Sequence, residues 1–331
     1  MNMKIDMHTH VAPREAVKIA EKGGYWHGIN FSRDKNEKLT TSHGDETMSL
    51  PWPVRMETPE ERLKSMDDRK IDMHILSLSP LMHWHKLDRE NSISYSQDVN
   101  DDISDYTEIN KSRFKSFCFL PLQDTDASIY ELERCVVSKG MVGAMVATNV
   151  NGMDWDSEKL YPILEAANEL KCLIFFHPTR GRANSWLTNY HLRNLIGNPL
   201  ETTVAMGNII FSGIMDKLPN LNLCFAHGGG YIRQGIGRFN HGYNVREEAK
   251  SNISHLPSDY LKSFYYDTIT HSEEGLRNLI NIVGDEQIFL GSDYPADMGE
   301  PYPVHFVENC SSITDSEKSK IFEENISKFF E

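Results

Sequence analysis

The chain has 331 residues, of which 39% are hydrophobic and 10% aromatic, and this composition excludes a disordered protein. Its 34 basic and 48 acidic residues give a formal net charge of −14, which argues against a nucleic-acid-binding surface. The five cysteines include no Cys-x-x-Cys pair, so the sequence predicts neither a disulfide framework nor a thiolate metal site.

The first residues contain no apolar segment of signal-peptide length, and no run reaches the roughly 18 apolar residues of a membrane-spanning helix. Several cysteines lie within apolar runs, which is typical of buried free thiols in a reducing compartment. We therefore expect a cytoplasmic protein that binds no membrane.

Eight short apolar runs predict β-strands at residues 4–10, 71–80, 114–122, 142–149, 172–177, 222–227, 263–271 and 287–293. Between them lie stretches with helical spacing, and one of these has Thr58 as an N-cap before Pro59. Alternating strands and helices favour parallel pairing, and eight such units fit a (β/α)₈ TIM-type barrel. A doubly wound open sheet is the alternative, although no Gly-x-Gly-x-x-Gly motif follows the first strand.

Two stretches interrupt this alternation. Residues 23–58 form an insertion after the first strand that is rich in Gly, Ser, Thr and Pro, and residues 178–200 follow the fifth strand. Long loops in a compact domain are usually lids or binding elements, and both would lie at the rim where barrel active sites occur. We expect residues 1–331 to form a single domain that carries both additions.

Polar residues with metal-binding chemistry stand at the predicted strand ends. His8 and His10 share one face of the first strand because side chains alternate along a strand. The fifth strand ends in His177, the sixth in His227 and the eighth in Asp293. A single histidine is weak evidence, but four strand ends together predict a divalent metal site with imidazole and carboxylate ligands.

Four motifs occur in order along the chain, namely HTH at 8–10, HP at 177–178, AHGGG at 226–230 and GSDYP at 291–295. With the segments PLETTVAMGNIIFSGIMDKLPNLNLC and SFYYDTITH, they resemble the amidohydrolase superfamily. More narrowly, the chain is similar to the α-amino-β-carboxymuconate-ε-semialdehyde decarboxylase branch over nearly its whole length. The resemblance implies a barrel enzyme with one Zn²⁺ per subunit, or another divalent metal such as Mn²⁺.

The resemblance also implies a role for each strand-end residue. His8, His10, His177 and Asp293 would bind the metal. Catalysis would fall to His227 and Asp293, with His227 as the base that takes a proton from metal-bound water.

For the substrate, the resemblance implies a small carboxylic acid and a homodimer or higher homo-oligomer, because Arg238 of the partner subunit would bind a carboxylate. Arg55 is the nearest candidate for a second arginine, and it matches the branch only after a shift in alignment. His271 and Trp186 are further candidates for substrate binding. Thr179 replaces an aromatic residue of the branch, which indicates a changed pocket.

Three functions stay open at this point. The first is a zinc-dependent non-oxidative decarboxylase of an unsaturated or aromatic acid. The second is a metal-dependent hydrolase of a lactone, an amide or a carbon–carbon bond, which the same ligands would serve. The third is a non-catalytic barrel with a structural metal, but such sites are usually closed and have no base nearby.

Overall fold

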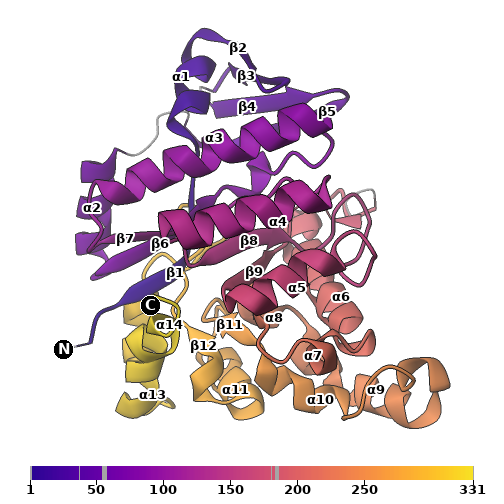
Figure 1. Ribbon diagram of the computed structural model, residues 1–331. Helices are drawn as coiled ribbons and strands as arrows, with labels where there is room; N and C mark the ends of the chain where they lie inside the picture. Colours follow the sequence, from indigo (N-terminus) through magenta and orange to yellow (C-terminus); the bar gives the residue numbers. More distant parts are fainter. Residues whose placement is uncertain (1, 37, 54–57, 180, 183–185, 331) are drawn as a thin grey trace.

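A barrel of eight parallel strands forms the centre of the computed structural model, which describes residues 2–36, 38–53, 58–179, 181–182 and 186–330 (Figure 1). The strands are neighbours in chain order, and every predicted strand is present. Their bounds are β1 Ile5–Val11, β6 Met73–Leu78, β7 Phe114–Cys118, β8 Gly143–Ala147, β9 Leu173–His177, β10 Asn222–Phe225, β11 Tyr265–Asp267 and β12 Ile288–Phe289.

Backbone hydrogen bonds join the first strand to the segment after the last one and close the sheet. The Asp293 N–H donates to the His8 carbonyl at 2.8 Å, and the His10 N–H donates to the Tyr294 carbonyl at 2.7 Å. The architecture is therefore the predicted (β/α)₈ barrel. The closure also places Asp293 beside the strand that carries the two N-terminal histidines.

Helices cover the outside of the barrel, as the alternating pattern predicts (Figure 1). Thr58 caps α2 as expected, because its hydroxyl accepts from the Glu61 N–H while the Glu61 carboxylate accepts from the Thr58 N–H. The longer helices are α1 Arg14–Lys22, α2 Pro59–Asp68, α3 Arg89–Glu108, α4 Thr125–Glu133, α5 Tyr161–Leu170, α6 Asn198–Phe211, α9 Ile232–Val245 and α11 Glu273–Val283. The shorter ones are α7 Ile214–Lys217, α8 Ala226–Gly229, α10 Pro257–Tyr260, α12 Pro303–Asn309, α13 Asp315–Ser319 and α14 Asn325–Ser327.

The insertion after the first strand, which its composition predicts to be a long loop, is instead a small antiparallel sheet. Its strands pair in the order β2 Gly24–Trp26, β3 Ile29–Arg33, β4 Lys38–His43 and β5 Glu46–Pro53. Ile29 and Phe31 of β3 are buried and alternate with more exposed residues, which is the period of a half-buried strand. This sheet lies next to α1, above the barrel in the view of Figure 1.

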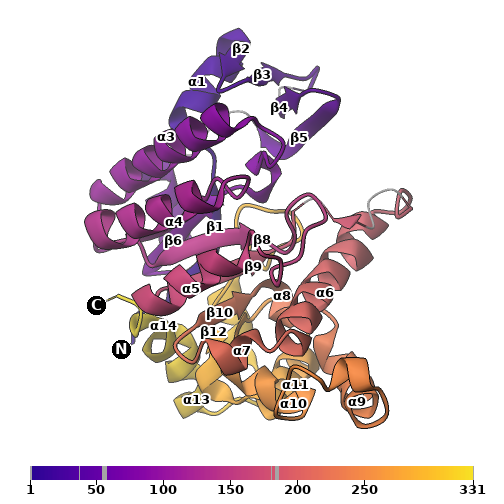
Figure 2. The ribbon, with the colours of Figure 1, turned by 45° about the vertical axis from the view of Figure 1, so that its right-hand side comes forward.

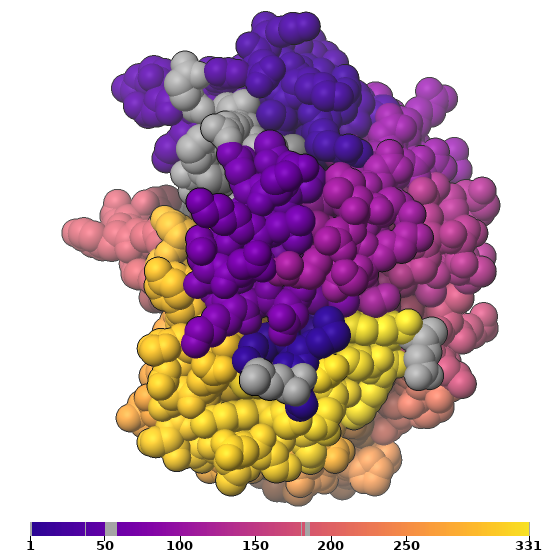
Figure 3. Space-filling model, turned by 90° about the vertical axis from the view of Figure 1, so that its left-hand side faces the viewer, coloured from indigo at the N-terminus to yellow at the C-terminus, as the bar shows by residue number. Residues whose placement is uncertain are grey.

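The two ends of the chain lie side by side on one face of the barrel (Figure 3). Lys4, just before β1, forms an ion pair of 3.2 Å with Glu308 of α12, and the Met3 N–H donates to Glu323 at 2.9 Å. The C-terminal helices therefore hold the strand that carries His8 and His10. None of the helices in the described part of the chain has the length and apolar character that a membrane crossing needs.

Candidate metal centre

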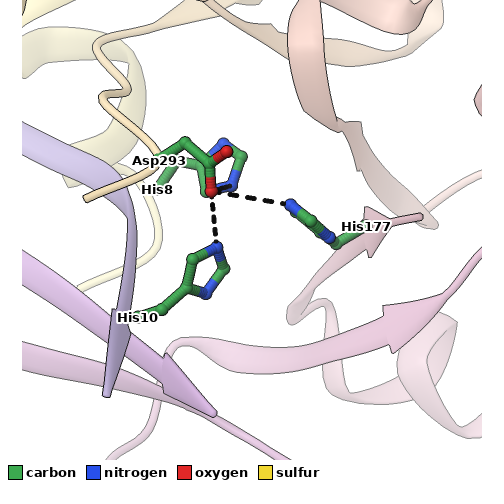
Figure 4. A group of neighbouring side chains, drawn as sticks. All are labelled: His8, His10, His177 and Asp293. Carbon is green, nitrogen blue, oxygen red and sulfur yellow. Dashed lines mark hydrogen bonds and ion pairs between the residues drawn. The ribbon is translucent and has the colours of Figure 1, made fainter. Parts of the chain in front are cut away.

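Four predicted site residues meet at one end of the barrel (Figure 4). His8 and His10 project from β1, His177 ends β9, and Asp293 follows β12 by four residues. All four are buried, and one donor atom from each lies within 4.8 Å of the others. Strand ends that are far apart in sequence therefore supply one compact cluster of imidazole and carboxylate groups.

Hydrogen bonds fix the tautomers of His8 and His10. The Asp267 carboxylate lies 2.8 Å from His8 Nδ1, and as an acceptor it takes the Nδ1 proton. Ser77 donates its hydroxyl to the Thr9 carbonyl at 2.8 Å, so it accepts from His10 Nδ1 at 3.0 Å. Each ring therefore has its Nδ1 proton held by the protein and directs Nε2 into the cluster.

His177 has the same arrangement, because its Nδ1 donates to the Pro178 carbonyl at 2.8 Å. The Nε2 atoms of His8, His10 and His177 lie 3.2, 2.9 and 3.8 Å from Asp293 Oδ1. Among the described residues, Nε2 of His8 and Nε2 of His177 are buried without a hydrogen-bond partner. Buried nitrogens that converge on a carboxylate in this way fit a divalent cation.

The charges of the cluster also fit a cation. Burial lowers the pKa of His10 to about 4 and that of His177 to about 3, so both rings are neutral, as metal ligands must be. Burial also acts to lower the pKa of His8, but the carboxylates of Asp293 and Asp267 raise it to about 10. The two carboxylates therefore favour one positive charge at the His8 ring.

Asp267 is a further residue of this site and is not among the residues predicted from the sequence. It is buried at the end of β11, and its carboxylate accepts from His8 Nδ1 at 2.8 Å. The same carboxylate accepts the backbone N–H groups of His227, Gly228 and Ile269 at 2.8, 2.9 and 3.0 Å. One carboxylate thus orients the His8 ring of the cluster and holds the loop that carries the neighbouring histidine.

His227 lies beside the four-residue cluster and not inside it. It follows the end of β10 in the short helix α8, with a left-handed φ of 57°. Its Nε2 lies 3.5 Å from Asp293 Oδ2, the oxygen opposite the one that faces the other rings. Asp293 and His271 have left-handed φ values as well, and such conformations in non-glycine residues cluster at functional sites.

Two hollows open onto the cluster, and both are lined by His227 and Asp293. The first hollow, of about 260 Å³, extends over His10 and His177 toward His191 of the rim segment. The second hollow, of about 310 Å³, extends toward the start of α9 and the loop after β11. A small molecule in either hollow would lie against His227, which is the geometry that a proton-transferring group requires.

The predicted substrate-binding residues have different positions relative to these hollows. His271 lines the second hollow. Arg238 is exposed on α9, Trp186 is 63% exposed, and within the described part of the chain neither belongs to the lining of the two hollows. Arg55 lies outside the described residues.

Comparison with known proteins agrees with this geometry. A family model described as amidohydrolase matches residues 5–331. A 2-amino-3-carboxymuconate-6-semialdehyde decarboxylase from Dictyostelium discoideum is 32% identical, and the alignment covers 99% of this chain and 91% of that protein.

Solved structures show the same fold. IDCase from Metarhizium anisopliae in apo form superposes with a TM-score of 0.84 at 21% identity, covering 99% of this chain and 97% of that one. A dihydroxybenzoic acid decarboxylase from Polaromonas sp., with bound manganese and the inhibitor 2-nitroresorcinol, has a TM-score of 0.79 at 23% identity and covers 100% and 97%. The family model spans nearly the whole chain and includes every residue of the cluster, so this protein belongs to the amidohydrolase family.

Proposed function

We propose that this protein is a metal-dependent carboxy-lyase that removes carbon dioxide, without an oxidant, from a small unsaturated or aromatic carboxylic acid. The observation that carries the proposal is the convergence of three histidine Nε2 atoms and Asp293 next to His227, at the floor of two hollows. The names of the Dictyostelium relative and the Polaromonas structure support it, because both are decarboxylases.

The ion that we propose is Zn²⁺, one per subunit, held by His8, His10, His177 and Asp293. Imidazole nitrogens and a carboxylate oxygen are ligands that zinc accepts readily. Mn²⁺ is the alternative, and the manganese in the Polaromonas structure supports it. When bound, such an ion supplies a positive charge that polarises substrate oxygens and lowers the pKa of coordinated water.

His227 is the proposed general base and acid. Its Nε2 reaches both the cluster and the hollows, so it can take up a proton and return it at the reacting carbon. The hydrogen bond from its backbone N–H to Asp267 fixes the position of the ring at the edge of the site. Asp293 completes the catalytic pair, because one of its oxygens faces His227 and the other faces the metal-binding rings.

The same ligands and base would serve a hydrolase acting on a lactone, an amide or a carbon–carbon bond. The metal centre does not discriminate between hydrolysis and decarboxylation, so the deciding feature is recognition of a substrate carboxylate. The family resemblance supports an arginine for this role, namely Arg238 of the partner subunit in a homodimer.

Exposed apolar residues support the homodimer. Tyr190, Leu195 and Tyr231 are 88%, 46% and 39% exposed, and the Tyr231 hydroxyl donates to the Leu195 carbonyl at 2.8 Å. Tyr190 and Leu195 belong to the rim segment that leads into α6, which Figure 2 shows on the right, and Tyr231 directly precedes α9. Exposed apolar side chains that lie together often mark a protein–protein surface, and Leu195 and Tyr231 are in contact at the start of the helix that carries Arg238.

The substrate class is tested by incubating metal-loaded protein with a panel of hydroxybenzoates, pyridine carboxylic acids and muconate-type acids. We expect release of carbon dioxide from at least one acid, with no cofactor beyond the metal, measured by a coupled bicarbonate assay. Metal-free protein serves as the control. Turnover of lactones or amides with none of the acids would contradict the proposal and favour the hydrolase.

Asp267→Asn tests the support of the metal site. The amide removes the charge that holds His8 Nδ1–H, so metal affinity should fall by about 10- to 100-fold, the usual effect of losing such a partner. Asp293→Ala removes a ligand and should abolish stoichiometric binding, measured by elemental analysis and chelator competition. Asp105→Asn, on an exposed side chain, is the control. Unchanged metal binding in both site variants, or full activity without metal, would refute the ligand set.

His227→Ala tests the role of the base. We expect the variant to keep its metal and to lose turnover by about 10²- to 10⁴-fold, which is the usual contribution of a general base. His255→Ala, which changes an exposed histidine, should leave both properties unchanged. Loss of the metal from the His227 variant would instead make this residue a ligand.

Complementation tests the shared site. Arg238→Ala and Asp293→Ala subunits, each expected to be inactive alone, are denatured, mixed and refolded. Activity should return, because a mixed dimer contains one site with an intact Asp293 and an intact arginine from its partner. Failure to recover activity in verified mixed dimers would exclude a shared arginine.

A further inference from the structure

Arg233 lines the second hollow together with His227, Asp293 and His271. It belongs to the first turn of α9, whereas Arg238 is exposed five residues later, about 7.5 Å further along the helix axis. The Arg233 side chain lies against the loop that carries the base, since a Cβ added to Gly228 would be 3.8 Å from its Nη2 atom. The guanidinium is therefore next to the site of chemistry in its own subunit.

The surroundings of this guanidinium leave part of its hydrogen-bonding capacity without a protein partner. Nη1 donates to the Gly275 carbonyl at 2.7 Å, whereas Nε is buried without a hydrogen-bond partner among the described residues. Within the described ranges, Arg233 donates to the Gly275 carbonyl but forms no ion pair with a carboxylate. An arginine has five N–H donors and a permanent charge, and partial burial of such a group is costly unless an anion compensates it.

The carboxylate that interacts electrostatically with Arg233 does not fill this role. Asp267 contributes to the electrostatic environment of Arg233, and burial lowers the pKa of the arginine. However, both oxygens of Asp267 already accept hydrogen bonds from His8 and from the backbone of the following loops. The hydrogen bond from Arg233 to the Gly275 carbonyl could equally be made by an uncharged N–H group. This bond therefore does not explain why a charged side chain stands at position 233.

We propose that Arg233 binds a carboxylate of the substrate in the second hollow of its own subunit, while the reacting carbon lies against His227. The inference rests on the proposed function for the identity of the anion. It gives each site an intrasubunit anchor for the acid, in addition to Arg238 from the partner. Arg233 is thus a substrate-binding residue that selects acids over neutral analogues of the same shape.

The test compares an acid with its neutral isostere. Binding of 3-hydroxybenzoate and 3-hydroxybenzamide to metal-loaded protein is measured by calorimetry for the unchanged chain, Arg233→Gln and Arg233→Lys. The glutamine keeps an N–H donor for the Gly275 carbonyl but removes the charge. We expect affinity for the acid to fall by about 10-fold or more, as for lost hydrogen bonds to a charged group, with little change for the amide.

The remaining variants separate a binding role from a structural one. Arg233→Lys should recover part of the preference for the acid, and Arg246→Gln, on an exposed arginine paired with Glu248, should retain all of it. Should Arg233→Gln fail to fold, Arg233→Met replaces it in the same comparison. Equal losses for acid and amide, or no preference for the acid in the unchanged chain, would overturn the proposal.

Two further measurements separate the role of Arg233 from the proposed decarboxylase activity and from the shared Arg238 site. Loss of the acid preference in Arg233→Gln supports carboxylate binding by Arg233, whether or not an acid of the panel releases carbon dioxide. If the preference is lost and no acid is turned over, only the proposed decarboxylase function is contradicted. In mixed dimers of Arg233→Gln and Asp293→Ala subunits, the site with an intact Asp293 should keep the weakened acid affinity of Arg233→Gln, because no site then has both groups. Recovery of the acid affinity of the unchanged chain in these dimers would place Arg233 in the neighbouring site and contradict the intrasubunit role.

Discussion

The carboxylate of Asp267 is the group on which the arrangement of the site depends. It accepts four hydrogen bonds, one from the ring of His8 and three from the backbone of His227, Gly228 and Ile269. These bonds connect β1, the loop after β10 and the loop after β11. The buried charge is stable there because every donor is fixed by the barrel. A single side chain therefore positions both the His8 ring and His227, the proposed metal ligand and the proposed base, while Asp267 itself has neither proposed role.

The barrel and the clustering of the strand-end residues could be predicted because both depend on local periodicity. Buried parallel strands appear in a sequence as short apolar runs, and side chains at their C-terminal ends meet at one rim. The positions of His8, His10, His177 and Asp293 at strand ends therefore predicted that they lie together. Asp267 was missed because the predicted strand ran on to His271, whereas β11 ends at Asp267 itself.

The remaining features depend on interactions that the sequence does not display. The strands of the insertion pair with one another in an antiparallel sheet. Because the insertion is rich in polar and turn-forming residues, its sequence is hard to distinguish from that of a loop. The left-handed backbone of His227 is set by the hydrogen bond from its N–H to a distant carboxylate. Arg233 faces the second hollow only because the chain turns through Gly228, Gly229 and Gly230 before α9 begins, and all three glycines have positive φ.

The pairing of the chain ends has a consequence for biosynthesis. The strand that carries His8 and His10 leaves the ribosome well before Glu308 and Glu323, which in the folded protein bind Lys4 and Met3 just ahead of that strand. Asp293 also follows the two histidines by most of the barrel sequence. The four-residue cluster consequently cannot form on a nascent chain that has not yet reached Asp293. Because the Asp293 N–H bonds to the His8 carbonyl where the sheet closes, closure of the barrel and completion of the cluster are one step, and that step depends on contacts of long sequence separation.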